Sequence, residues 1–134
     1  MNQLELAEKI AREAHLWQFR RDGVTPYIKH VEAVVSRCKT DEEKAAAWLH
    51  DVCEDCAEWN EVELLKAGVE YGTAFCAKLM SKDRYEDYDS YIAAVSGNHV
   101  TRAVKIADIL SNLADSPTDA QIRKYASALL ILLA

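Results

Sequence analysis

The chain has 134 residues, so the usual size of domains predicts one domain spanning residues 1–134. Half of the residues are hydrophobic and 28% are charged, which allows a buried core and excludes a disordered chain. The net charge of −6 argues against binding nucleic acid or an anionic membrane through the overall field of the protein. Four glycines and two prolines are too few for an all-β sandwich, which needs a turn about every 8–12 residues.

Targeting segments are not evident in the sequence. Residues 1–15 carry charges throughout, unlike a signal peptide. The longest apolar run, Ala126–Ala134, is far shorter than the roughly 20 residues of a membrane helix. We therefore expect a cytoplasmic protein whose four cysteines are reduced thiols. The Cys53-x-x-Cys56 pair lacks two further ligands at a spacing typical of a zinc site.

The spacing of apolar residues is helical from the start of the chain. A first helix carries an apolar face from Leu4 to Trp17. Thr25 and Pro26 then predict the start of a second helix, with Thr25 as N-cap and Pro26 at the first helical position. Thr40 and Glu43 have the spacing of a capping box, which predicts the start of a third helix.

Helical spacing continues to the C-terminus. The further predicted helices cover Asn60 to Gly68, the segment around Phe75–Met80, Tyr85 to about Gly97, His99–Ala114, and a last helix opening at Ser116-Pro117. Together these elements predict an all-α, single-domain bundle of about seven or eight short helices. The C-terminal part of the last helix, Ala126–Ala134, is apolar on all sides. We therefore expect it to enter the core or pack against a second subunit, as in a homodimer.

Polar residues interrupt the third helix where a core would be expected. His50 and Asp51 follow the apolar segment Ala45–Leu49, and Glu54 and Asp55 come four residues after them. On a continuous helix this spacing places all four on one face. Burying these carboxylates unpaired would cost several kcal/mol, which a divalent cation would offset. Imidazole and carboxylate ligands favour Mn, Fe or Zn.

Two further polar residues occupy apolar helices. His30 lies in the predicted second helix, and Asp108 interrupts the run Val104–Leu110. Each has an ordinary explanation on its own: His30 as a hydrogen-bonded core histidine, and Asp108 as the ion-pair partner of Lys105. Their combination with His50 and Asp51 predicts that the four side chains bind one metal ion.

The order of these residues resembles that of HD-domain phosphohydrolases, specifically the hydrolase module of RelA/SpoT-type alarmone enzymes and their small stand-alone relatives. The matching segments are Ala14-His15 with Gln18 and Arg20, Gly23, Thr25–His30, Leu49–Asp55, and Val104–Asp108 with Asn112-Leu113. The resemblance covers about residues 5–125, and the His50-Asp51 pair combined with Glu54-Asp55 is its most specific part.

The resemblance implies a role for each matching residue. The expected metal ligands, usually of manganese, are His30, His50, Asp51 and Asp108. Glu54 and Asp55 would act on the attacking water and the leaving group. The expected nucleotide contacts are Arg20, Arg21, Lys105 and Asn112. The implied reaction removes pyrophosphate from the 3′ position of guanosine 3′,5′-bis(diphosphate) and leaves GDP.

One departure from the family bears on the substrate. Trp17 stands where these enzymes commonly have glycine, and a bulky ring there is expected to reshape or close the base pocket. Two alternatives stay open: another HD-type nucleotide phosphohydrolase, such as a nucleotidase or a dinucleotide-phosphate phosphatase, and a non-catalytic nucleotide-binding module. In each case the expected partner is a small-molecule nucleotide, with no nucleic acid and no membrane.

Overall fold

The fold is entirely helical, in a computed structural model that describes every residue from Met1 to Ala134. The helices in chain order are α1 (Gln3–Ala14), α2 (Ile28–Ser36), α3 (Asp41–Leu49), α4 (Val52–Asp55), α5 (Glu61–Lys66), α6 (Tyr71–Leu79), the 3₁₀ helix η1 (Lys82–Arg84), α7 (Tyr88–Ser96), α8 (His99–Leu113) and α9 (Asp119–Leu132). Eight α-helices have six or more residues, whereas α4 is a single turn of four. The predicted all-α bundle of seven or eight helices is confirmed.

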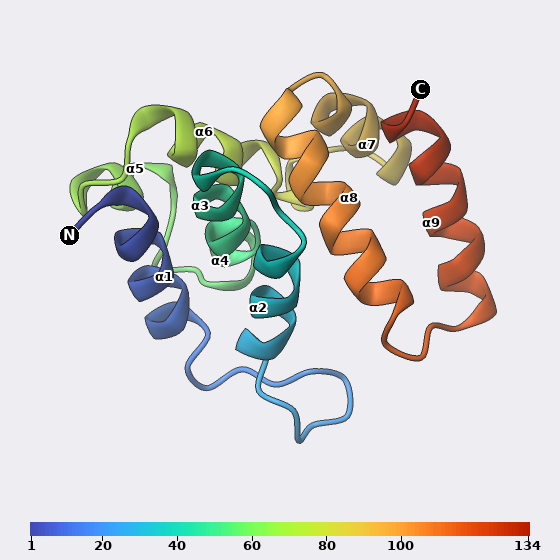
Figure 1. Cartoon of the computed structure of the whole chain (residues 1–134), viewed down its shortest axis with the longest axis horizontal. Helices are drawn as coiled ribbons and strands as arrows, with labels where there is room; N and C mark the ends of the chain where they lie inside the picture. Colours follow the sequence, from blue (N-terminus) through green and yellow to red (C-terminus); the bar gives the residue numbers. More distant parts are fainter.

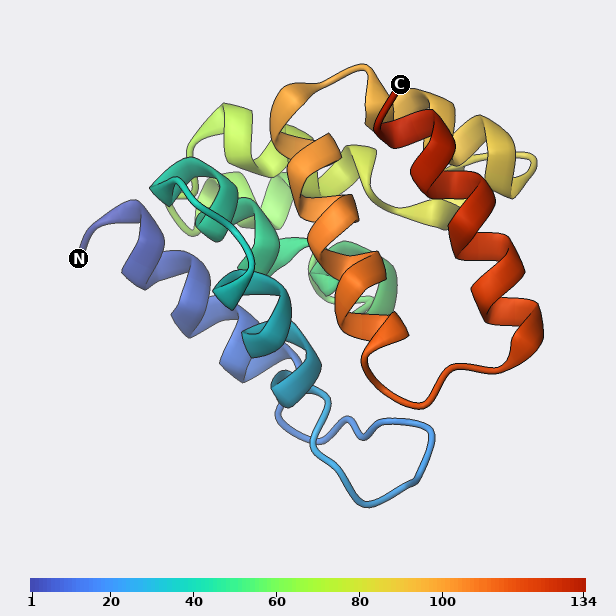
Figure 2. The same ribbon diagram turned by 45° about the vertical axis from the view of Figure 1, so that its right-hand side comes forward.

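Helix α8 lies between the two halves of the bundle (Figures 1 and 2). It packs against α2 and α3 on one side and against α7 and α9 on the other. Helix α3 reaches the interior because Ala45, Ala46 and Ala47 are all buried, and their small side chains let α1, α2 and α8 approach closely. The C-terminal end of α3 therefore points its next residues, His50 and Asp51, into the centre of the protein.

The segment between α1 and α2 differs from the prediction at both ends. Helix α1 ends at Ala14, and the Trp17 side chain is 83% exposed rather than part of a helical face. Helix α2 begins at Ile28 with Tyr27 at the N-cap, so the predicted N-cap at Thr25 is wrong. The Thr25 hydroxyl instead donates to the carboxylate of Asp22, at 2.6 Å. That local contact competes with capping and holds Thr25 in the loop.

The third predicted helix is interrupted after Leu49, just before the polar residues His50 and Asp51. Helix α3 stops at Leu49, and α4 begins only at Val52. The expectation that His50, Asp51, Glu54 and Asp55 share one continuous helical face is therefore wrong. The first hydrogen bond of α4 runs from the Asp55 N–H to the carbonyl of Asp51, its N-cap, at 2.9 Å.

The C-terminal helix α9 packs on one side only. Ala128 and Leu132 are buried, whereas Leu130 and Leu133 are 77% and 68% exposed. Insertion into the core is thus confirmed for one face of the helix, and the homodimer stays a prediction. None of the helices combines the length and apolar character needed to cross a membrane.

Candidate metal centre

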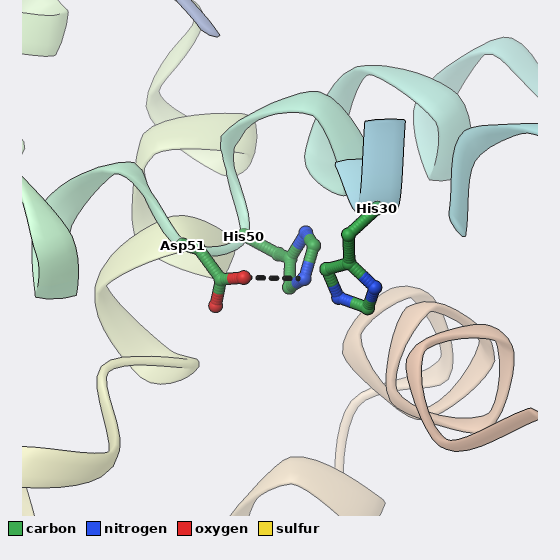
Figure 3. Close-up of side chains that lie close together, drawn as sticks. All are labelled: His30, His50 and Asp51. Atoms are coloured by element: carbon green, nitrogen blue, oxygen red, sulfur yellow. Dashed lines mark ion pairs between the residues drawn. The ribbon is translucent and has the colours of Figure 1, made fainter. Parts of the chain in front are cut away.

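Three of the predicted metal ligands face one another at the centre of the bundle. Figure 3 shows His30 from α2, His50 at the C-terminal end of α3, and Asp51 immediately after it. One ligand-capable atom of each lies within 4.8 Å of those of the other two. The structure therefore brings this part of the predicted ligand set together.

The fourth predicted ligand, Asp108, reaches the same group from the middle of α8. Its Oδ1 lies 2.8 Å from His30 Nε2 and 3.6 Å from His50 Nε2. The side chains of His30, His50 and Asp108 are all buried. Residues separated by 78 positions in the sequence thus meet at the buried inner end of a cavity.

The ring of His50 is held in a state that suits a metal ligand. Its Nδ1 lies 2.6 Å from the Ala47 carbonyl, which can only accept, so Nδ1 carries the proton and the neutral ring has its lone pair on Nε2. This buried Nε2 makes no hydrogen bond, although Asp51 Oδ2 lies 3.0 Å away. A lone pair facing carboxylate oxygens is stable only with a cation or a proton between them, so this donor set fits a divalent metal ion.

The charges around His50 also favour a bound cation. Burial lowers the pKa of His50, but the nearby carboxylates of Asp51 and Asp108 raise it more, to well above its usual range. The cluster therefore attracts positive charge to His50 Nε2.

Lys105 is already engaged inside this cluster. Its Nζ lies 2.8 Å from Asp108 Oδ2, one turn away on α8, and 5.1 Å from the centre of the Tyr91 ring. Burial raises the pKa of Asp108, but the charge of Lys105 and the contacts with His30 and His50 together lower it to well below its usual range. Lys105 lines the cavity, and its bond to Asp108 holds that carboxylate in place. Its contact with substrate stays a prediction.

The two predicted catalytic carboxylates face different cavities. Glu54 lines a cavity of about 210 Å³ together with His30, Asp51 and Asp108, and its Oε2 accepts the N–H of Lys82 at 2.8 Å. Asp55 lines a separate cavity of about 390 Å³ with Gln18, Phe19 and Tyr27. Burial, followed by the charges of Asp51 and Glu54, raises the pKa of Asp55 to about 6.

The predicted nucleotide contacts gather at the rim of the 210 Å³ cavity. The guanidinium of Arg20 donates to Asp115 Oδ2 at 3.1 Å and to Asn112 Oδ1 at 3.3 Å. Arg21 lines the same cavity and forms no ion pair within the protein. Asn112 also donates to Asp108 Oδ1 at 3.4 Å, which joins the rim to the metal-facing residues.

Sequence reasoning missed the opposite rim of this cavity, which is formed by η1, α7 and α9. Its residues are Lys82, Tyr88, Lys124 and Tyr125. Lys124 Nζ lies 4.3 Å from the centre of the Tyr88 ring, and the buried Tyr88 hydroxyl has no partner. Burial and the charges of Lys82 and Lys105 lower the pKa of Lys124. No local sequence pattern predicts that these residues line a cavity, apart from the tyrosines that recur along the predicted helix from Tyr85 to about Gly97.

The expected obstruction by Trp17 does not occur. Its ring points into solvent and is not part of the cavity wall, so the cavity stays open beside Arg20 and Tyr27.

No family model and no curated protein matches this chain.

Proposed function

We propose that the protein is a metal-dependent phosphohydrolase of the HD-domain type that hydrolyses guanosine 3′,5′-bis(diphosphate) at its 3′ side, giving GDP and pyrophosphate. The observation that carries this proposal is the buried, unpartnered Nε2 of His50, which faces the carboxylates of Asp51 and Asp108 with His30 beside it.

The ligand set favours one class of metal. Two imidazoles and two carboxylates, from His30, His50, Asp51 and Asp108, suit Mn²⁺ or another divalent transition metal. A bound cation of this kind lowers the pKa of water and polarises a phosphoryl oxygen. The protein holds the four ligands before any ion binds, since Ala47 and Lys105 already orient His50 and Asp108.

Asp55 and Glu54 divide the proton transfers between them. Attacking and leaving oxygens lie on opposite sides of the phosphorus in a displacement at phosphate. Asp55, with a pKa of about 6, is ready to accept a proton from water near neutral pH and opens to its own cavity. Glu54 opens to the cavity that also holds the cationic rims, where the leaving group would lie.

The charge on the two rims supports a substrate with phosphates at two separate positions. Arg20 and Arg21 come from the loop before α2, and Lys82 and Lys124 from η1 and α9, on the other side of α8 (Figure 2). Anionic groups on both sides of a nucleoside would each meet a pair of cations. The rings of Tyr88 and Tyr125 offer surfaces on which a base can stack.

A nucleotide panel tests this function. Chelator-treated protein is reloaded with Mn²⁺ and incubated with guanosine 3′,5′-bis(diphosphate), nucleoside monophosphates and dinucleotide phosphates, with separate detection of pyrophosphate and orthophosphate. We expect pyrophosphate and GDP from the first substrate, and no turnover by the Asp51→Asn variant. Orthophosphate from the other substrates at an equal or higher rate would support a phosphatase instead. Nucleotide binding without any product would support a non-catalytic module.

A further inference from the structure

Asp51 needs an external partner to orient its carboxylate. It lies between the last residue of α3, Leu49, and the first residue of α4, Val52, so no regular helix fixes its side chain. It is the residue at the N-cap position of α4, yet it caps no backbone N–H. The hydroxyl of Tyr27, 24 residues earlier, donates to Asp51 Oδ2 at 2.5 Å.

The backbone of Tyr27 is fixed independently of Asp51. The Tyr27 N–H donates to the Gln18 carbonyl at 2.8 Å, and the Arg20 N–H donates to the Thr25 carbonyl at the same distance. These bonds close the loop before α2, which turns at Gly23 in a left-handed conformation with φ of 72°. The loop therefore presents Tyr27 at a set position, whichever group the hydroxyl meets.

The ring of Tyr27 is also confined. Its centre lies 5.0 Å from the centre of the His15 ring and 5.7 Å from that of His30. His30 in turn lies 5.8 Å from His50, so the four rings form a row that ends at the metal-facing residues. His15 is buried and its Nδ1 lies 2.6 Å from Gln18 Oε1, which anchors the far end of the row. Contacts with both histidine rings limit the motion of the Tyr27 ring, which keeps its hydroxyl directed at Asp51.

We propose that Tyr27 is a positioning residue that fixes the carboxylate of Asp51 for metal binding, an inference that rests on the proposed metal centre. A carboxylate offers about four lone-pair sites. The phenol proton takes one of those on Oδ2, the same oxygen that lies 3.0 Å from His50 Nε2. With that site taken, the carboxylate cannot rotate freely, and its remaining lone pairs stay available beside the histidines.

Removing only the hydroxyl tests this role. Tyr27→Phe keeps the packed ring and frees the carboxylate of Asp51. Loss of such an outer partner typically costs about 10–100-fold in metal affinity or activity. We expect Mn²⁺ affinity, measured by calorimetric titration, to fall by that factor. At saturating Mn²⁺, kcat should recover to within a few-fold of the unaltered protein, with KM unchanged.

Tyr85→Phe is the matched control. It removes a hydroxyl that donates to the Leu79 carbonyl at 2.9 Å, away from the cavity, so Mn²⁺ affinity should not change. Equal Mn²⁺ affinity in Tyr27→Phe and the unaltered protein would overturn the positioning role alone. An equal loss of affinity in both variants would overturn it too, because it would show a general effect on folding. Absence of Mn²⁺ binding by the unaltered protein would overturn the metal centre and this inference together.

Discussion

The cavity has two walls that differ in how their residues are held. The inner wall consists of the candidate metal ligands His30, Asp51 and Asp108, with the buried His50 in contact with them. The outer wall consists of Lys82, Tyr88, Lys124 and Tyr125. Inner-wall side chains are largely buried, and each contacts another charged or hydrogen-bonding group at 2.5–3.0 Å. Lys124 in the outer wall instead faces solvent and rests on the ring of Tyr88. We infer that the inner wall sets the chemistry and the outer wall sets substrate affinity.

The largest effect is expected from Asp108→Ala in the inner wall. The change removes a predicted ligand and leaves Lys105, only 8% exposed, without its ion-pair partner. Breaking a buried pair on one side costs about 3–5 kcal/mol, so urea denaturation should show a folded but weakened protein. Metal content and activity should both fall to background.

Asp115→Ala is the control for that change. Asp115 pairs with Arg20 but its side chain is 65% exposed, so the loss should be no more than about 1 kcal/mol, with metal still bound. Full activity in Asp108→Ala would contradict the claim that the inner wall sets the chemistry.

Glu54→Gln and Asp55→Asn should show the next largest effect. Neither residue belongs to the proposed ligand set, so metal content should match that of the unaltered protein. Loss of a general acid or base typically lowers turnover by about 10²–10⁴-fold. Unchanged turnover in both variants, measured at saturating substrate and Mn²⁺, would show that neither Glu54 nor Asp55 takes part in proton transfer.

Outer-wall substitutions should act on KM. Hydrogen bonds to charged groups contribute about 1.5–3 kcal/mol, so Lys82→Gln and Lys124→Gln should each raise KM by roughly 10–100-fold. Their kcat should stay within a few-fold, because the groups bind substrate before and during the reaction alike. Arg123→Gln, next to Lys124 on α9 but outside the cavity wall, is the control. A fall in kcat with constant KM would place Lys124 in the chemical step.

The smallest expected effect is the contribution of Asp55 to the pH dependence of folding stability. Its pKa is raised to about 6 in the folded protein, mainly by burial, whereas an unfolded aspartate titrates near 3.9. Between pH about 4 and 6 the unfolded chain releases this proton first, so folding stability falls as pH rises and then levels off above 6. Asp55→Asn should lack this component. Urea unfolding of both metal-free proteins from pH 4 to 7 measures the difference, and parallel curves would contradict the assignment.

The inner wall could be predicted from sequence because it violates the apolar pattern. An aspartate amid Val104–Leu110, or His50 and Asp51 after Ala45–Leu49, is costly to bury without a strong partner, and the structure supplies such partners. The break at the end of α3 could not be predicted, since the i,i+4 spacing of its residues is compatible with a continuous helix. Contacts of Asp51 with Tyr27, far away in the sequence, accompany the change of direction there.

The outer wall could not be predicted, because Lys82 and Lys124 look like ordinary surface lysines. Only the packing of α7 against α8 and α9 brings them to the same cavity. The start of α2 was mispredicted for a local reason, since Asp22 accepts the Thr25 hydroxyl and two neighbouring backbone N–H groups.

Titration of chelator-treated protein with Mn²⁺, by calorimetry with parallel metal analysis, tests the central claim most directly. The unpartnered Nε2 of His50 beside Asp51 and Asp108 predicts one ion bound per chain. It also predicts that His30→Ala and Asp51→Asn each abolish or greatly weaken binding, with helical content unchanged by circular dichroism. Absence of saturable Mn²⁺ binding by the unaltered protein, or binding by both variants as tight as that of the unaltered protein, would contradict the claim. The cluster would then be a proton-stabilised ion-pair network.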